Sequence, residues 1–112
     1  MPLIWTAWNN GKHLATGAGY GLKVPVIDRD RYFKRGWSSV IVEIPFDRGY
    51  AEVSVNVDKP SFWNESCHEL ISQEIGQWFR NTGLAPWPSH QPPKLVVEVI
   101  SEGRFRITGT NS

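Results

Sequence analysis

SVIVEIPFDRGYAEVSVNV, residues 39 to 57, alternates apolar and polar side chains on either side of a short polar turn. Successive side chains of a β-strand point to opposite faces, so this alternation gathers the apolar ones on one face. The apolar set is Val40, Val42, Ile44, Phe46, Ala51, Val53, Val55 and Val57. The turn DRGY, which contains Gly49, joins the halves as an antiparallel hairpin. The opposite face of this part of the sheet meets water or lines a polar groove.

Strand signals continue toward the N-terminus. Residues 3–8 precede Asn-Gly at 10–11, a dipeptide typical of a type I′ hairpin turn, and 12–16 follow as the predicted return strand. A further extended segment covers 22–27. It contains Pro25, which cannot donate a hydrogen bond to a neighbouring strand and therefore favours an edge or a bulge.

The C-terminal part of the chain predicts one more hairpin. The strands 94–100 and 104–108 flank Glu102-Gly103, which is a turn signal. Ahead of them, the proline-rich segment LAPWPSHQPP over 84–93 is suited to neither a helix nor an inner strand. We expect it to be a stiff connector.

One long helix is expected over 62–82. Apolar residues recur there at spacings of three and four and form one stripe. The stripe consists of Trp63, Cys67, Leu70, Ile71, Ile75, Trp78 and Phe79. Ser61 is a suitable N-cap and Gly83 a suitable residue just past the C-terminus. Because an isolated helix is marginal in water, this stripe should pack across the sheet.

These elements predict a single α+β domain over residues 1–112. Its strongly bent antiparallel sheet has six or seven strands in the order β-β-β-β-β-α-β-β, and it packs on the long helix. A length of 112 residues suits one hydrophobic core. An open sheet leaves edges, so a homodimer that covers one of them is an expected partner arrangement.

The composition excludes several classes of protein. Lys and Arg number 12 against 11 Asp and Glu, so no overall charge attracts nucleic acid or an anionic membrane. Cys67 is the only cysteine, which excludes an internal disulfide and fits a reducing, cytoplasmic location. The first residues resemble no signal peptide, and no apolar run is long enough to span a bilayer. The six tryptophans indicate an aromatic core with one or two rings left for a ligand or partner.

The segment HLATGAGYGLKV, residues 13–24, raises the question of a phosphate-binding loop. Such a loop needs a helix directly after its glycines, whereas LKVPVI follows here. We interpret Gly17, Gly19 and Gly21 as a bend where a positive φ angle or a close backbone approach is required. If the bend opens onto a groove, the ring of Tyr20 should lie at its rim. If there is no groove, the ring should pack in the core and the bend should have an architectural role alone.

The segment DRDRYFKRGW, residues 28–37, mixes basic and aromatic side chains. Its candidate ligand-binding residues are Arg29, Arg31, Tyr32, Arg35 and Trp37, and Lys34 adds a further positive charge. Such a mixture can bind single-stranded nucleic acid. However, Asp28 and Asp30 can pair with the neighbouring arginines. A self-paired loop anchored to the core by its aromatics is therefore favoured over nucleic-acid binding.

The remaining candidate metal-ligating and catalytic residues do not form a complete motif in the sequence. Glu65 and His68 form one Glu-x-x-His motif, whereas a carboxylate-bridged metal site needs two such motifs. The second is absent, so no metal or cofactor is predicted. Neighbouring residues on a helix point about 100° apart, so Cys67 and His68 could not act as nucleophile and base. An alternative is a small hydrolase-like enzyme in which a histidine meets a carboxylate. Its candidates are His13, His68 and His90 with Asp28, Asp30, Glu43 and Glu69.

The sequence thus favours a non-enzymatic binding or protein-interaction module. Its aromatic and polar groove would be bordered by the glycine bend, the 28–37 segment and the proline-rich connector. The ligand would be an unidentified small molecule or protein. The predicted site residues are Tyr20, Arg29, Arg31, Tyr32, Arg35, Trp37, Trp87 and His90.

Overall fold

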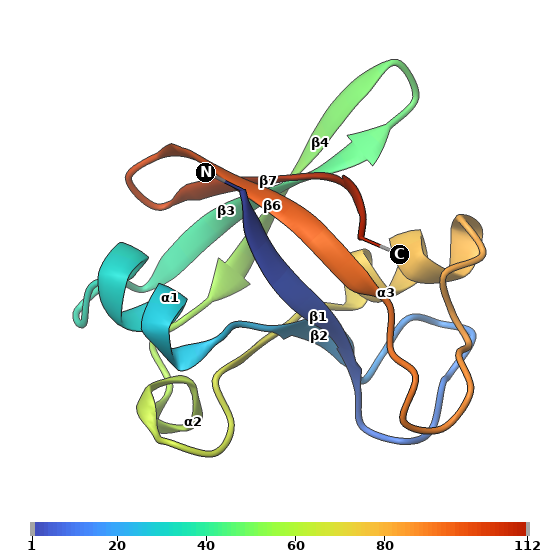
Figure 1. Ribbon diagram of the computed structural model, residues 1–112, viewed down its shortest axis with the longest axis horizontal. Helices are drawn as coiled ribbons and strands as arrows, with labels where there is room; N and C mark the ends of the chain where they lie inside the picture. The colour runs from blue at the N-terminus through green and yellow to red at the C-terminus, as the bar shows by residue number, and fades with distance from the viewer. Residues whose placement is uncertain (1, 112) are drawn as a thin grey trace.

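The structure, a computed structural model, describes residues 2–111, which form seven strands and three short helices (Figure 1). The strands are β1 (Leu3–Asn9), β2 (Tyr20–Lys23), β3 (Ser39–Phe46), β4 (Gly49–Asn56), β5 (Glu69–Ile71), β6 (Lys94–Ser101) and β7 (Arg104–Thr110). The helices are α1 (Val26–Tyr32), α2 (Pro60–Trp63) and α3 (Gln73–Asn81). No helix of residues 2–111 is long and apolar enough to cross a membrane.

The strands belong to one sheet in the order β4-β3-β7-β6-β1-β2-β5. Neighbouring strands are antiparallel except β3 and β7, which run parallel. The end strands β4 and β5 approach each other, so the sheet curls into a nearly closed barrel. Aromatic rings fill part of its interior. The rings of Phe33 and Phe105 stack with their centres 4.8 Å apart, and the centre of the Trp5 ring lies 5.1 Å from that of Phe105.

The hairpin predicted from residues 39–57 is confirmed. β3 and β4 pair antiparallel, with Val42 opposite Val53. Val40, Val42 and Val53 are buried, while the alternating residues of β4 face outward. The pattern succeeded because it depends only on neighbouring residues and a short turn.

The prediction of one long helix over 62–82 is wrong. In its place lie α2, a loop, β5 and α3. The Asn64 Oδ1 accepts hydrogen bonds from the backbone N–H groups of Ser66 and Cys67, which competes with helical pairing. His68 then adopts a left-handed backbone with φ 53°, which interrupts any helix. The longer of the two helices that form here, α3, begins at Gln73 and is capped by Ser72, whose side chain accepts from the Ile75 N–H.

The apolar stripe predicted one continuous helix, but its residues belong to separate elements, chiefly β5 and α3. Leu70 is buried in β5, while its neighbour Ile71 is 44% exposed, as expected for a strand. Ile75 and Phe79 are buried on α3. The predicted class, an α+β antiparallel sheet on one long helix, is therefore corrected to a mostly β, mixed, nearly closed barrel with short helices.

The strand predicted over 12–16 is also wrong. The strand that returns beside β1 is β2, which starts at Tyr20 opposite Asn9. The Asn9 side chain accepts from the N–H groups of Gly11 and His13, so this segment forms a wide loop in place of a two-residue turn. Past β2, the chain turns into α1 directly after Pro25, where an extended segment and a polar connection were expected.

The glycine bend behaves as predicted. Gly17 and Gly19 have φ angles of +87° and +80°. A side chain on Gly17 would collide with the backbone of α3, and one on Gly21 with the Leu70 carbonyl of β5. These glycines therefore let the bend pack tightly on its neighbours.

Candidate functional site

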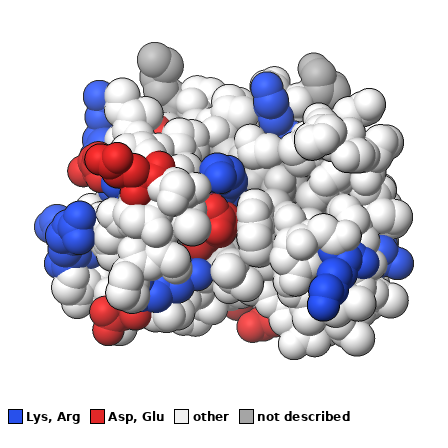
Figure 2. Space-filling view, turned by 90° about the horizontal axis from the view of Figure 1, so that it is seen from below, with Lys and Arg blue, Asp and Glu red and all other residues white. Residues whose placement is uncertain are grey.

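The predicted site residues do not share one groove. Arg29 and Arg35 lie beside α2, whereas Tyr20, Trp87 and His90 gather where the 10–19 and 82–93 loops meet. In Figure 2, charged side chains of both signs crowd the half of the lower face that holds α1 and α2. The other half carries fewer charged side chains, most of them Lys or Arg.

Arg29 is a structural residue. It is 4% exposed, and its Nη1 donates to the carbonyl oxygens of Phe62 at 2.9 Å and Asn64 at 2.6 Å. Its Nε also pairs with Asp30 at 3.1 Å. Because these bonds engage Nη1 and Nε of a buried guanidinium, we assign Arg29 to holding α1 against the end of α2.

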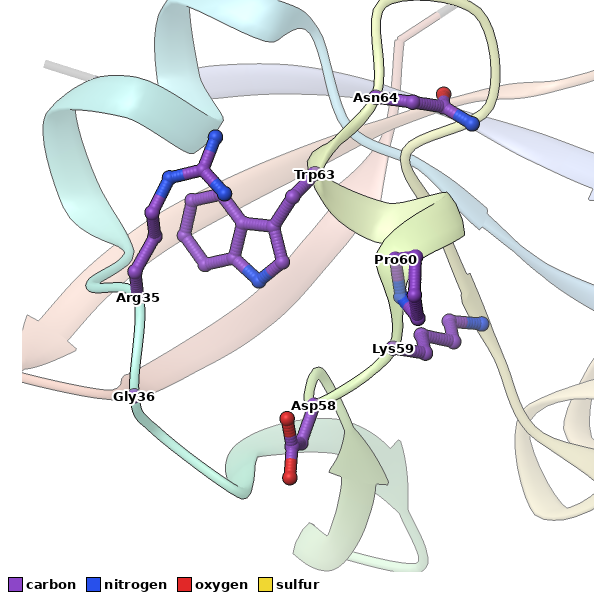
Figure 3. A pocket seen from close by; sticks show the side chains of 7 residues that line it. All are labelled: Arg35, Gly36, Asp58, Lys59, Pro60, Trp63 and Asn64. Atoms are coloured by element: carbon purple, nitrogen blue, oxygen red, sulfur yellow. The ribbon is translucent and has the colours of Figure 1, made fainter.

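Arg35 and Trp63 border a concavity of about 480 Å³ beside α2 (Figure 3). The Arg35 guanidinium lies 4.8 Å from the centre of the Trp63 ring, and the Trp63 Nε1 donates to the Val57 carbonyl. Figure 3 shows the Lys59 side chain pointing away from this ring. Burial lowers the pKa of Lys59, and the nearby Glu69 carboxylate opposes that shift. The cations therefore do not converge on one point of this pocket.

The other predicted residues of this segment are dispersed. Arg31 is exposed at the end of α1, and Tyr32 lies beside Glu98 and Val99. The half-buried Trp37 lines a separate hollow at the β6–β7 turn, where it contacts Gly103. None of these three side chains lines the concavity that Arg35 borders.

A second concavity, here called the histidine cleft, has a volume of about 400 Å³. Its lining consists of Asn9, Gly11, His13, Trp87, Ser89 and His90. The side chains come from the loop after β1 and from the proline-rich connector. None of them is Lys, Arg, Asp or Glu, so the lining is polar without fixed charge apart from any charge on its histidines.

Tyr20 lies in the core and contacts two residues of the cleft lining, His13 and Trp87. Its side chain is completely buried, which is the outcome expected if the glycine bend itself does not open onto a groove, and its hydroxyl lies 2.8 Å from the Nδ1 of His13. The buried hydroxyl hydrogen needs an acceptor, and Nδ1 is the one that residues 2–111 offer it. We therefore assign Tyr20 as donor and the His13 proton to Nε2.

Aromatic packing holds the same ring in place. The His13 ring stands edge-on to Trp87 at 4.8 Å and to Tyr20 at 5.4 Å. Trp87 in turn contacts Tyr20 at 5.7 Å and Phe79 at 6.0 Å. The cleft wall is thus continuous with the core, so its side chains are preorganised.

The cleft also contains strained backbone. His13 and His90 have φ angles of 48° and 64°, in the left-handed region that non-glycine residues rarely occupy. The Arg80 Nη1 donates to the His13 carbonyl at 3.2 Å, which helps to hold the loop. Such strain persists where surrounding contacts enforce it, and it concentrates at functional sites.

The carboxylates considered for a hydrolase have other partners. Asp28 accepts from the Trp5 Nε1, Glu43 pairs with Arg104 and Arg106, and Glu69 lies near Lys23. His68 is buried, and its Nδ1 donates to the Val24 carbonyl. Within residues 2–111 no ion pair joins a histidine to a carboxylate, nor do three metal-ligating side chains cluster.

Sequence reasoning missed part of the cleft. His13 entered only as a candidate base, and Asn9 and Ser89 did not enter at all. The available signal was the pair of loops rich in Asn, Gly, Ser and His, but loop sequences do not specify which loops meet. No family model, curated protein or solved structure matches this chain.

Proposed function

We propose that this domain is a binding module whose histidine cleft takes a small planar ligand with a hydrogen-bond acceptor. The observation that carries the proposal is the Tyr20–His13 hydrogen bond at 2.8 Å. It engages the Nδ1 of His13, so in the assigned tautomer the other ring nitrogen, Nε2–H, is the donor that this cleft-lining residue can offer to a ligand. A donor of fixed position beside an aromatic wall is the arrangement typical of small-molecule sites.

The chemistry of the lining defines the ligand class. Trp87 offers apolar surface for a flat ring, and His13 offers a donor to a carbonyl or carboxylate oxygen. Ser89 and His90 add polar groups at the edge of the cleft. Because Lys and Arg are absent from the lining, a multiply charged phosphate would find no strong counter-ion there.

The Arg35 pocket supports this role less well. The Arg35 guanidinium already lies over Trp63, and the Arg29 Nη1 already donates to two backbone carbonyls. These contacts account for both arginines as ties between α1 and α2. A ligand in this pocket would have to displace the Arg35–Trp63 contact, which is worth about 0.5–1 kcal/mol at an exposed site.

A fragment titration followed by NMR tests the proposal. Benzoate combines a flat ring with an acceptor, and benzylamine carries the same ring with a donor cation. We expect benzoate to shift the amide and ring signals of His13, Trp87 and His90, and benzylamine to shift them much less. The variant His90→Ala should weaken the benzoate response, whereas the exposed control Lys34→Ala should keep it. Benzoate shifts confined to other surfaces would reject the cleft as the site.

Two expectations about the setting accompany this proposal. The single cysteine, Cys67, supports a reducing, cytoplasmic location. A homodimer stays a prediction, which light scattering would measure directly.

A further inference from the structure

An apolar groove of about 350 Å³ lies between the β3–β4 hairpin and α3. The tip of this hairpin projects from the body of the barrel (Figure 1). The floor of the groove consists of Ile44, Ala51 and Val53, which share the inner face of the hairpin. Ile44 and Val53 are buried, and Ala51 is half-buried. The groove therefore brings the hydrophobic core to the surface.

Two aromatic side chains from separate elements line the groove. Phe46, at the end of β3, is 66% exposed, and Trp78 on α3 is half-buried. The Trp78 ring contacts the ring of Phe79, whereas Phe46 has no ring contact in the described part of the chain. An apolar group bound against Phe46 and Trp78 would remove their exposed surface from water. The volume is near the lower limit for small-molecule sites, which suits a ligand with a single ring.

The charged side chains of the lining are all acidic. Asp47, Glu52 and Glu74 belong to it, and no Lys or Arg does. Glu52 is bonded to Arg104 at 2.6 Å. Asp47 and Glu74 enter no ion pair within residues 2–111, and the exposed Arg48 of the same turn as Asp47 pairs with neither. Two carboxylates therefore keep uncompensated charge beside an apolar floor.

Helix α3 holds one of these carboxylates beside an aromatic ring. Glu74 and Trp78 are four residues apart, so their side chains are neighbours on one face of the helix, and both line the groove. An ammonium group is attracted to the face of a tryptophan ring and, more generally, to a carboxylate. A cation beside Glu74 and Trp78 gains both interactions while the rest of its molecule stays on the apolar floor.

We propose that this groove binds a small aromatic ammonium compound, in which one flat ring is joined to an ammonium group by a short alkyl chain. The ring packs on the floor against Phe46, and the ammonium group lies beside Trp78 and Glu74. The carboxylate of Asp47 adds to the negative charge of the lining. A hydrated metal ion fits less well, because the floor is apolar and no three metal-ligating side chains cluster in residues 2–111.

The groove and the histidine cleft select opposite charges. Carboxylates line the groove, whereas none lines the cleft. The two sites share no lining residue. Binding at one site is therefore measured by signals that do not belong to the other.

Three probes of nearly the same size test this site on the intact protein. Near neutral pH, 2-phenylethylamine is a cation, 3-phenylpropionate is an anion, and 2-phenylethanol has the same ring without a charge. In an NMR titration, we expect the amine to shift the signals of Phe46, Ala51 and the Trp78 indole and to bind with a dissociation constant of about 1 mM. The alcohol should bind about fivefold more weakly, and the carboxylate at least about tenfold more weakly.

A pair of isosteric substitutions removes the charge of the lining. Asp47→Asn with Glu74→Gln keeps the shape of both side chains, and asparagine tolerates the left-handed φ angle of 56° found at Asp47. The amine should then bind at most about twofold more tightly than the alcohol. The matched control, Asp58→Asn with Glu65→Gln, makes the same change in net charge at exposed positions outside the groove. It should keep a preference for the amine of about fivefold.

Four outcomes would overturn the proposal. These are equal binding of the amine and the alcohol to the wild type, amine shifts confined to residues outside the groove, loss of the preference in the control variant as well, and a dimer of the free protein that buries the groove. The comparison of the three probes on the wild-type protein does not depend on how well a variant folds.

Discussion

The hydroxyl of Tyr20 lies 2.8 Å from the Nδ1 of His13, so a core residue orients a side chain of the histidine cleft. Tyr20 is fully buried, whereas His13 is half-buried. Their hydrogen bond therefore links the packing of the barrel to the chemistry of its surface. Changes made in the core at this point should be detectable in the cleft.

Replacing Tyr20 with phenylalanine should separate orientation from packing. Tyr20→Phe keeps the ring and removes the hydroxyl, so we expect a loss of about 1 kcal/mol in the free energy of unfolding. The proton on His13 should then no longer be confined to Nε2, which the ring ¹⁵N chemical shifts of His13 would report. Tyr32→Phe is the control because its side chain is outside the cleft. Unchanged His13 shifts in Tyr20→Phe would contradict the tautomer assignment.

The strained backbone at His90 predicts opposite effects on stability and binding. A left-handed backbone costs a non-glycine residue about 1–2 kcal/mol, and glycine avoids this cost while losing more chain entropy on folding. We expect His90→Gly to raise the free energy of unfolding by about 0.5 kcal/mol and to weaken benzoate binding. Urea denaturation and the NMR titration measure the two quantities. A less stable His90→Gly variant would show that the side chain matters for folding.

The buried carboxylate of Glu43 makes stability depend on pH. Hydrogen bonds from Arg104 and then Arg106 hold the pKa of Glu43 below its ordinary value of 4.5. A lowered pKa in the folded state stabilises the protein above pH 4.5, and this contribution is lost as the pH falls through the folded-state pKa. Glu43→Gln should therefore cost about 1–3 kcal/mol near neutral pH and much less in acid.

Urea denaturation of the wild type and of Glu43→Gln across this pH range checks the prediction. Glu98→Gln serves as the control because Glu98 is exposed and forms no ion pair within residues 2–111. An equal difference between wild type and Glu43→Gln at acid and neutral pH would refute the assigned role of the carboxylate.

Gly76 tests the contact between α3 and the glycine bend. Glycine to alanine in a helix normally stabilises by about 1 kcal/mol. Here the added Cβ would overlap the Gly17 carbonyl and lie 2.7 Å from the Tyr20 Cβ. Gly76→Ala should therefore lower the free energy of unfolding by about 1–3 kcal/mol. Gly49→Ala, at a position with open space around it, should be nearly neutral.

The sequence named part of the lining of the proposed cleft as candidates and missed the rest. Trp87 and His90 were expected to bind a ligand, and both line the cleft. Arg29 belongs to a segment whose mixture of basic and aromatic residues suggested ligand binding, but its side chain is buried and donates to two backbone carbonyls. A sequence records charge and aromatic content, whereas burial depends on which distant segment covers the residue.

The sequence by itself determined the local elements whose signals lie within a few neighbouring residues. The alternation over 39–57 specified a hairpin, and the glycines of 13–24 specified a bend with positive φ angles. Only the tertiary structure decided that 69–71 is a strand, because that short segment gains its hydrogen bonds from β2. It also decided that loops 10–19 and 82–93 meet, since long-range packing of Tyr20, Phe79 and Trp87 brings His13 and His90 to the same cleft.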